Sequence, residues 1–390
     1  MELTIESIRD GDRERHHALM RQAFGGTDTF DPDAPQADPE RFVCAYLGDR
    51  LVGSVLTFDF AMTWGGRGVP CGGVSGVVVS PEARGRAAAR RMLAEAFDRM
   101  DRRGQVTSAL YPTTASLYRG AGFEIVGWFR RRQIPLSAIA TETAEALHWQ
   151  EVPLDDERIR RFHDDMAARH DGWFRVDPGW WAHRVRRQRR DATANRYAYV
   201  GARGGADVAV VQYRYEKAGE FYDLEVEVLA GIDVDAIGAA LALLAGHGTT
   251  AEHATTSLPD AAIGPHVPQL QRTATASDWP WMLRLVDAPA AVAARGWPRC
   301  VAGTVDLDIV DDSRPANAGA HVLEVGDGQG ALLRGGSGRV RVTIQDLAML
   351  YAGCDVPGLR AAGRLVGATA DDLDVLAAAC VSNPSIPLFF

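Results

Sequence analysis

A short stretch of this chain, between Val74 and Gly127, gathers residue types that can bind an anion and move a proton. A run of three valines ends at Ser80-Pro81, and a turn rich in arginine, glycine and alanine precedes a predicted helix that continues through Met100. The first amides of a helix lack partners and, with the helix dipole, favour a phosphate group. Small side chains let the backbone approach the phosphate, and arginines add charge. On its own, such a turn is equally compatible with a solvated basic helix start, because short patterns of this kind are common.

A second group of residues, Ser116 to Glu124, places a tyrosine at a glycine-rich turn: Ser-Leu-Tyr-Arg-Gly-Ala-Gly-Phe-Glu. The phenol of Tyr118 has an ordinary pKa near ~10, so it is protonated at neutral pH and can donate a proton or hydrogen bond. The alternative is an aromatic ring packed under the turn. Tyr111 is a weaker candidate, because it stands at the end of a predicted strand, before Pro112, where packing is the expected role.

These residues must be positioned by a strand, a turn, a helix, a second strand and a second turn, in that order. A similar pattern occurs twice. Two strands joined by a turn are predicted within residues 42–60 and again within 197–215, each followed by a further strand and a helix. The second copy lacks the arginines, and Asp233 and Asp235 at its helix start would repel a pyrophosphate. It is therefore interpreted as a scaffold, although a coincidental αβ pattern is an open alternative.

The chain changes character after about Leu285. Strands are predicted near 303–310, 321–325, 330–333 and 339–344, separated by turns rich in Gly, Asp and Asn, as in a meandering antiparallel sheet. Helices are predicted for 344–352 and 370–379. This succession resembles a sterol-carrier-protein-type domain. The 390 residues exceed what a single core usually holds, so two or three domains are expected.

Composition narrows the class of protein. The hydrophobic fraction of 46% and the charged fraction of 24% are those of an ordinary soluble protein, and the net charge of −9 argues against nucleic acid as the main partner. Five cysteines are scattered without metal-like spacing, so no metal site is expected. The sequence shows neither an apolar leader nor a run of ~20 apolar residues, which predicts a cytoplasmic protein without a membrane partner.

The pattern Val-x-Val-x-Pro-x-x-Arg-x-x-Ala-x-Ala, followed by Leu-Tyr-Arg-Gly-Ala-Gly-Phe, resembles the GNAT acyl-CoA N-acetyltransferases. Ala87 stands where that family normally has glycine, so the loop is expected to close with a slightly displaced pyrophosphate. The resemblance implies that acetyl-CoA is the acyl donor. Its implied binding residues are Val77, Val78 and Val79 of the strand, Arg84, Gly85, Arg86, Ala87, Ala88, Ala89 and Arg90 of the turn, and Thr113 and Thr114 after the next strand.

Two GNAT-like units followed by a sterol-carrier-like unit resemble the enhanced intracellular survival (Eis) family of aminoglycoside N-acetyltransferases. Residues 173–185 are also similar to the middle region of that family. The fold class implied is α/β (α+β): two tandem GNAT-like domains with mixed sheets flanked by helices, then a sterol-carrier-like α+β domain. The expected domains are 1–135, the catalytic one, 136–284, the degenerate one, and 285–390. The implied assembly is a homohexamer built from two trimers.

The resemblance also assigns roles to the two catalytic candidates. In that family the terminal carboxylate reaches the first active site as general base, which here is the α-carboxylate of Phe390, and Tyr118 serves as general acid. A free α-carboxyl has a pKa near ~3.5 and is ionised at neutral pH. Two prolines stiffen the tail 383–390 and apolar residues can bury it, although from the residues alone a hydrophobic plug is the simpler interpretation.

The expected reaction is direct transfer of acetyl to a primary amine of a small, multi-amine substrate such as an aminoglycoside, without a covalent acyl-enzyme. Asp28, Asp31 and Asp33 are candidate acids at the pocket mouth, or simply part of a solvated turn. Phe389 removes any acidic contribution next to the end, which leaves room for a more apolar amine. Two rival functions are a hydrophobic-ligand carrier and a non-catalytic CoA-binding scaffold.

Overall fold

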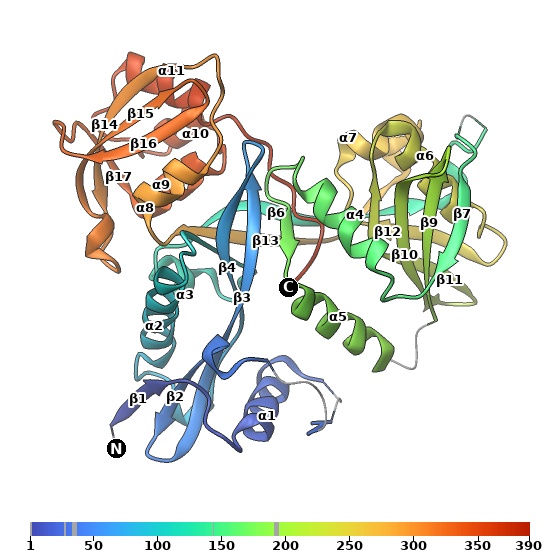
Figure 1. The fold of residues 1–390 in the computed structure, drawn as a ribbon, viewed down its shortest axis with the longest axis horizontal. Coiled ribbons are helices and arrows are strands. Elements are labelled where there is room, and N and C mark those ends of the chain that lie inside the picture. Colours follow the sequence, from blue (N-terminus) through green and yellow to red (C-terminus); the bar gives the residue numbers. More distant parts are fainter. Residues whose placement is uncertain (1, 27–28, 33–36, 143, 191–194) are drawn as a thin grey trace. The chain divides into compact units, whose positions relative to one another are not determined.

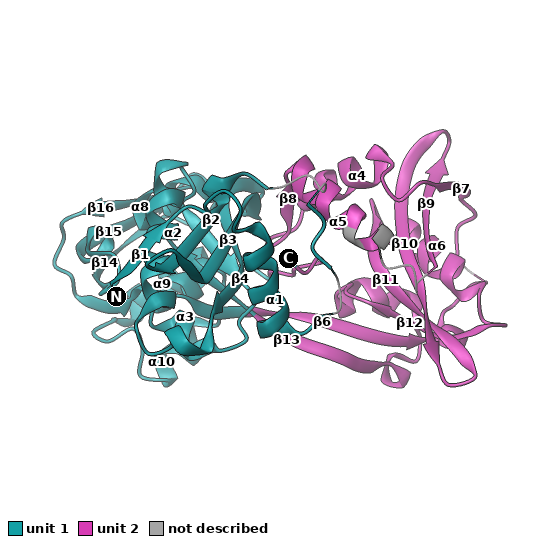
Figure 2. Cartoon of the chain, turned by 90° about the horizontal axis from the view of Figure 1, so that it is seen from below, with its two compact units in different colours: residues 1–126, 281–383, 390 teal, residues 127–280, 384–389 magenta. Residues whose placement is uncertain are grey.

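The computed structural model describes residues 2–26, 29–32, 37–142, 144–190 and 195–390, and Figure 1 shows the elements that they form. The chain folds into two compact units, distinguished by colour in Figure 2. Unit 1 comprises residues 1–126, 281–383 and 390, and unit 2 comprises residues 127–280 and 384–389. Phe390 therefore belongs to unit 1, whereas the residues directly before it belong to unit 2.

The amino-terminal sheet of unit 1 has the strand order β1-β2-β3-β4-β5-β13. The strands from β1 to β4 are antiparallel neighbours, whereas β5 runs parallel to β4. A parallel pair requires a crossover, and helix α2 provides it. The elements are β1 (Leu3–Glu6), β2 (Phe42–Leu47), β3 (Arg50–Trp64), β4 (Arg67–Val79), β5 (Thr107–Leu110), the end of β13 (Ala274–Leu285), α1 (Arg13–Phe24), α2 (Ala88–Arg102), α3 (Ala115–Arg119), and the 3₁₀ helices η1 (Pro39–Arg41) and η2 (Pro81–Ala83).

Helix α2 packs on this sheet because its apolar residues recur every three or four positions. Met92, Leu93, Ala96, Phe97 and Met100 are all buried and join one core cluster with residues of the sheet. This spacing puts them on one face of a helix, and the remaining face carries its acids and, except for the buried Arg99, its arginines. The same cluster includes the aromatic side chains of Tyr118 and Phe123, so the tyrosine-bearing turn is tied to the helix that follows the arginine-rich turn.

The second sheet of unit 1 has the strand order β16-β15-β14-β17. The expectation of a purely antiparallel meander is wrong for its last strand, since β17 runs parallel to β14. After β16 the chain crosses to the far side of β14 and adds β17 there, so β14 lies in the interior of the sheet. The elements are β14 (Gly303–Val310), β15 (Gly319–Gly326), β16 (Gln329–Arg334), β17 (Val340–Thr343), α8 (Ala288–Ala294), η6 (Pro315–Asn317), α9 (Ile344–Tyr351), α10 (Val356–Ala361) and α11 (Ala370–Ala379).

The sheet of unit 2 has the strand order β13-β6-β12-β11-β10-β9-β7. Strands β9, β10 and β11 are antiparallel, and β12 returns parallel to β11 after helix α6. The elements are β6 (Glu124–Pro135), η3 (Leu136–Ala138), β7 (His148–Val152), α4 (Glu157–Ala167), β8 (Phe174–Val176), α5 (Pro178–Arg190), β9 (Arg196–Arg203), β10 (Ala206–Ala218), β11 (Phe221–Gly231), α6 (Val234–Ala245), β12 (Ala251–Thr256), α7 (Asp260–Ile263), η4 (Gly264–His266) and η5 (Leu270–Arg272).

The repeated pattern in the sequence corresponds to repeated topology. In unit 1, strands β2, β3 and β4 lead through α2 to parallel β5, and in unit 2, strands β9, β10 and β11 lead through α6 to parallel β12. The start of α6 differs from that of α2 as expected from its residues. The carboxylate of Asp233 caps α6 by accepting a hydrogen bond from the backbone N–H of Ala236 (2.8 Å), and it also pairs with Arg203 (2.8 Å). An anion at this helix start would meet a fixed negative charge.

A half-buried histidine makes the stability of unit 1 sensitive to acid. His16 of α1 lies edge-on to the Phe42 ring (5.1 Å between centroids), and its Nδ1 is 2.9 Å from Oγ of Ser54. Burial, together with the nearby Arg13, lowers the pKa of His16 to about 4. Because the folded state binds this proton less readily than the unfolded chain, the contribution of His16 is fully present above pH ~6.5. It is lost as the pH falls from there toward 4.

We therefore expect the free energy of unfolding to fall by on the order of 2–3 kcal/mol between pH 7 and pH 4 through His16 alone. The variant His16→Gln should show a correspondingly shallower slope when urea unfolding is followed at intervals across this range. His148→Gln, on the exposed part of β7, is the matched control and should leave the slope unchanged. An identical slope in the wild-type and His16→Gln proteins would contradict the assignment.

Candidate active site

The arginine-rich turn connects β4 to α2 through η2 and an open loop. Gly85 (φ 76°) and Ala87 (φ 56°) are both in the left-handed region, so the backbone reverses direction immediately before the helix. Ala87 occupies the cap position and gives the helix start no side-chain hydrogen bond, and the first turn of α2 contains no acidic residue. The first amides of α2 are thus not capped by a side chain at that position, which suits an anion.

The charges around the turn favour the same ligand. The side chains of Arg84, Arg86 and Arg90 are exposed, whereas Ala88 is buried against the core and Ala89 is half-buried. The carboxylate of Glu82 at the beginning of the turn is paired with Arg50 (2.6 Å), so its negative charge is offset. The turn therefore presents three cations and a helix start to solvent, an arrangement that can hold a phosphate group.

Ala87 adopts a backbone conformation that costs an L-residue about 1 kcal/mol relative to glycine. The chain thus closes the turn despite the missing glycine, at the expense of local strain. We expect Ala87→Gly to raise the free energy of unfolding by about 1 kcal/mol, measured by urea denaturation. Ala89→Gly, inside the right-handed helix, is the matched control and should instead lower it by up to about 1 kcal/mol. A destabilised Ala87→Gly variant would show that the left-handed conformation is not strained.

Strand β4 carries a bulge directly before the turn. Ser54 pairs with Val78 and Leu56 pairs with Ser75, so Gly76 and Val77 together face Val55, and Gly76 takes φ 59°. A bulge of this kind bends a strand and redirects its amides. On the other edge, β4 pairs with β5 only between Cys71–Gly73 and Thr107–Ala109. From residue 74 to residue 79 the two parallel strands therefore part, and a linear ligand can hydrogen-bond to the edge of β4 as an added strand does.

Tyr118 lies in α3 and is largely buried, with 5% of the residue exposed. Its ring meets that of Phe123 edge-on, with centroids 6.1 Å apart, and its backbone carbonyl accepts hydrogen bonds from the amides of Ala121 and Phe123 (2.9 and 3.1 Å). Burial raises the pKa of the phenol to about 12, so it keeps its proton at neutral and mildly alkaline pH. The ring is packed under the turn and the hydroxyl keeps its proton, so packing does not prevent the phenol from acting as a donor.

Two exposed threonines separate β5 from α3. Thr113 and Thr114 follow the end of β5, and Thr114 is the cap residue of α3 without donating or accepting a capping hydrogen bond through its side chain. Both residues are exposed just beyond the end of β5, the strand that parts from β4. This position is compatible with contact to a ligand that lies between the two strands.

The last residue of the chain lies where β4 and β5 part. The Phe390 ring is 5.0 Å from that of Phe60 and 5.2 Å from that of Tyr111, edge-on to each. A Cβ on Gly73 of β4 would be only 3.1 Å from Cε2 of Phe390. Gly73 is the last residue of β4 that pairs with β5, so the terminal residue is seated at the fork between the strands.

Tyr111 also lies at the fork between β4 and β5. This side chain packs as expected, but its partner is Phe390, and burial raises the pKa of its hydroxyl well above the ordinary value. Its position directly after β5, the strand that parts from β4, was the only available signal. No pattern in the sequence predicted that Phe60 and Gly73 contact Phe390, because nothing in a long β-hairpin indicates which residues meet a distant chain end.

The residues that precede Phe390 are anchored in unit 2. The indole Nε1 of Trp173 donates a hydrogen bond to Oγ of Ser385 (2.9 Å), and the amide of Ser385 donates to the carbonyl of Asp171 (3.0 Å). The hydroxyl of Ser257 donates to the carbonyl of Pro387 (2.9 Å). Ile386 and Leu388 are 2% and 3% exposed, whereas Phe389 remains 49% exposed. The tail is therefore held by alternate apolar side chains and by backbone hydrogen bonds.

Other candidates contribute less to the site. Asp28 and Asp33 lie outside the described residues, and Asp31 is half-buried in the same loop. Burial raises the pKa of Cys44 and of Cys71 to about 12 each, so these thiols stay protonated and are poor nucleophiles. Within the described ranges, three or more His, Cys, Asp or Glu residues do not gather at any point as a metal site would require. Over the same ranges, none of the helices has the length and apolar character needed to cross a membrane.

Family comparisons agree with this architecture. Residues 4–126 match a family described as Acetyltransferase (GNAT) domain, residues 172–285 match a second family of the same description, and residues 288–387 match Sterol carrier protein domain. A search of curated protein sequences finds no significant match.

Solved structures with the same fold cover the whole chain. A GCN5-related N-acetyltransferase from Anabaena variabilis is 24% identical over 100% of both chains, with a TM-score of 0.91. A GCN5-related N-acetyltransferase from Kribbella flavida is 27% identical over 100% of both chains, with a TM-score of 0.81. Eis1 from Mycobacterium abscessus is 18% identical over 99% of both chains, with a TM-score of 0.82. The chain thus combines two GNAT acetyltransferase domains with a carboxy-terminal sterol-carrier-like domain, and it is an N-acetyltransferase of the GNAT type.

Proposed function

We propose that this enzyme transfers an acetyl group from acetyl-CoA directly to a primary amine of a small, multi-amine substrate. The α-carboxylate of Phe390 acts as general base and the phenol of Tyr118 acts as general acid. The observation that carries this proposal is the seat of Phe390 against Phe60, Gly73 and Tyr111, at the fork where β4 and β5 part.

The proposed binding of acetyl-CoA is based on the fork between β4 and β5 and on the arginine-rich turn. GNAT domains use acetyl-CoA as acyl donor, and the thioester supplies the activated acetyl group. The edge of β4 at Val77, Val78 and Val79 would hold the pantetheine chain, and the turn from Arg84 to Arg90 would hold the pyrophosphate. Thr113 and Thr114 would contact the chain from the β5 side. These assignments fit the parted strands, the bulge at Gly76 and the exposed cations of the turn.

The proton steps follow from the two catalytic candidates. The amine nitrogen forms a bond to the acetyl carbon, and the Phe390 carboxylate accepts the proton that the nitrogen loses. As the carbon–sulfur bond breaks, Tyr118 gives its proton to the departing sulfur. Solvent then returns a proton from the carboxyl group to the phenolate, so the enzyme is regenerated and the products are an amide and a thiol. A nucleophilic protein side chain is not required.

The substrate class and assembly are inferred from resemblance. The Eis-like order of domains supports an aminoglycoside-like amine and a homohexamer composed of two trimers. The aromatic rings of Phe60, Tyr111 and Phe390 form an apolar surface at the fork. An acceptor that binds there contacts this surface, which favours an amine attached to an apolar or ring-containing group. Light scattering coupled to gel filtration tests the hexamer directly.

Thiol release from acetyl-CoA with a panel of amines tests the proposed reaction. The panel contains aminoglycosides, polyamines, aromatic amines and lysine-containing peptides, and mass spectrometry of the product identifies the acetylated nitrogen. Turnover with one small amine class supports the proposal. Tight CoA binding without turnover on any amine would identify a CoA-binding scaffold instead, and binding of apolar ligands without CoA binding would identify a hydrophobic-ligand carrier.

A further inference from the structure

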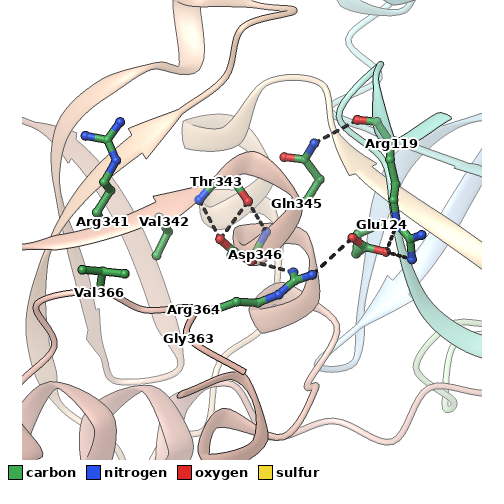
Figure 3. Close-up of a pocket in the computed structure, with 10 residues that line it drawn as sticks. All are labelled: Arg119, Glu124, Arg341, Val342, Thr343, Gln345, Asp346, Gly363, Arg364 and Val366. Atoms are coloured by element: carbon green, nitrogen blue, oxygen red, sulfur yellow. Dashed lines mark hydrogen bonds and ion pairs between the residues drawn. The ribbon is translucent and has the colours of Figure 1, made fainter. Parts of the chain in front are cut away.

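The turn that carries Tyr118 is held by residues of the sterol-carrier-like part of unit 1. Figure 3 shows these residues around a cavity of about 440 Å³. The side-chain Nε2 of Gln345, in the first turn of α9, donates a hydrogen bond to the backbone carbonyl of Arg119 (2.9 Å). Arg119 directly follows Tyr118, so this bond holds the peptide between Arg119 and Gly120, one residue beyond the proposed acid.

A chain of ion pairs supports the same turn. Glu124, whose side chain is 5% exposed, accepts hydrogen bonds from Nε of Arg119 and from the backbone N–H of Ile125, both at 2.9 Å. Arg364 lies between two carboxylates, with Nη1 2.6 Å from Oδ1 of Asp346 and Nη2 3.6 Å from Oε2 of Glu124. Figure 3 shows the guanidinium of Arg364 reaching from its own domain toward Glu124.

The carboxylate of Asp346 is itself fixed. It belongs to the capping box of α9, where it accepts hydrogen bonds from the amide (2.8 Å) and the hydroxyl (2.7 Å) of Thr343. Asp346, Arg364 and Glu124 therefore each have a hydrogen-bond or ion-pair partner. A ligand would have to compete with these carboxylates for Arg119 and Arg364, so the polar groups of this cavity serve to connect two parts of the fold.

Close packing around Gly122 also restricts movement of the turn that carries Tyr118. Gly122 has φ 87°, and a Cβ at this position would be 1.4 Å from Nη1 of Arg284 and 3.1 Å from Cγ2 of Ile344. The guanidinium of Arg284 forms an ion pair with Asp311 at 2.8 Å, and neither side chain is exposed. The turn from Tyr118 to Glu124 is thus confined by a buried ion pair below and by Gln345 and Arg364 at its rim.

We infer that Gln345 and Arg364 are positioning residues for Tyr118, and that the sterol-carrier-like domain serves catalysis by holding the proposed general acid in place. The inference rests on the proposed acid role of Tyr118. It assigns this domain a task that requires no lipid ligand. Because the hydrogen bond of Gln345 reaches only a backbone carbonyl, its removal should disturb the orientation of the turn while leaving the chemical groups of the active site intact.

A double-mutant cycle with Tyr118→Phe tests the inference. In the otherwise native chain, Gln345→Ala should lower kcat about fivefold, with the KM for acetyl-CoA unchanged, as expected when a single orienting hydrogen bond is lost. In the Tyr118→Phe background, Gln345→Ala should cause no further loss, because the group that it positions is absent. Arg364→Gln should show the same dependence on Tyr118 with a larger loss.

Arg341→Gln is the matched control. Arg341 lines the same cavity, but its side chain is 64% exposed and pairs with Asp308 (3.2 Å) of its own domain, so kcat should stay at the native value. An equal loss from Gln345→Ala in both backgrounds, or no loss in either, would overturn the positioning role. If Tyr118→Phe itself left kcat unchanged, the proposed acid role would fail first, and the inference would fail with it. Thermal midpoints of all variants separate these effects from loss of folding.

Discussion

Removal of Phe390 is expected to lower kcat/KM for the amine by about 10³-fold, the usual range for loss of a general base. The truncated chain still ends in a carboxylate, but this group is displaced by one residue, which is about 3.5 Å along the chain. A base at that distance no longer reaches the reacting nitrogen within hydrogen-bond range. Initial rates of thiol release with the preferred amine measure the loss, and CoA binding measured by calorimetry should be preserved.

Two further variants separate the carboxylate of Phe390 from its ring. Phe390→Ala keeps the terminal carboxylate and removes the contacts with Phe60 and Tyr111, so only a moderate loss of about tenfold is expected from looser positioning. One glycine added after Phe390 keeps the ring and moves the carboxylate, so it should reproduce the large loss. If the extended chain were as active as the native one, the base would have to lie elsewhere in unit 1.

Substitution of Tyr118 by phenylalanine is expected to lower kcat by about 10²-fold while leaving the KM for acetyl-CoA unchanged. The ring packs against Phe123, and phenylalanine preserves this contact, so stability should change little. Steady-state kinetics with varied acetyl-CoA separates kcat from KM. Tyr111→Phe is the matched control, because this tyrosine contacts Phe390 but occupies no position from which it is proposed to give a proton.

The pH dependence of the native enzyme offers an independent check on Tyr118. Burial raises the pKa of this phenol to about 12, so the protonated, donating form persists through pH 10. The rate of the native enzyme should therefore not fall near pH 10 through loss of this proton. Any decline that is seen there should also be present in Tyr118→Phe. Such a decline would mean that the phenol titrates at its ordinary pKa and lies in a more hydrated setting than the one described here.

The second GNAT domain forms hydrogen bonds to the tail that precedes Phe390. Trp173 and Ser257 hold the tail through Ser385 and the carbonyl of Pro387. The second GNAT domain thus holds Ser385 and Pro387 of the tail by hydrogen bonds. This is consistent with its interpretation as a scaffold, and the Phe390 variants will measure how strongly the reaction depends on the position of the chain end.

Much of the architecture was predictable from local patterns. The repeated strand–helix–strand order, the amphipathic helix α2 and the turns around Gly85 and Gly122 follow from residue spacing and from glycine at positions of positive φ, because these features depend on neighbours along the chain. The division into two GNAT domains and a sterol-carrier-like domain was identified from the resemblance of these patterns to known families, and the family comparisons confirm it. The antiparallel meander predicted for the last sheet holds for β14, β15 and β16 but is wrong for β17, because strand partners are chosen by packing across the whole sheet.

The sequence by itself determined the arginine-rich turn, the missing glycine at Ala87 and the presence of a tyrosine in the second turn. The tertiary structure decided the partners of these groups. Phe60, Gly73 and Tyr111 meet Phe390 although they are hundreds of residues away in the chain, and Gln345 reaches the carbonyl of Arg119 across the fold. The physical reason is that periodicity specifies which face of an element is apolar, whereas the partner of that face is selected by the shape and charge of surfaces formed only when the chain has folded.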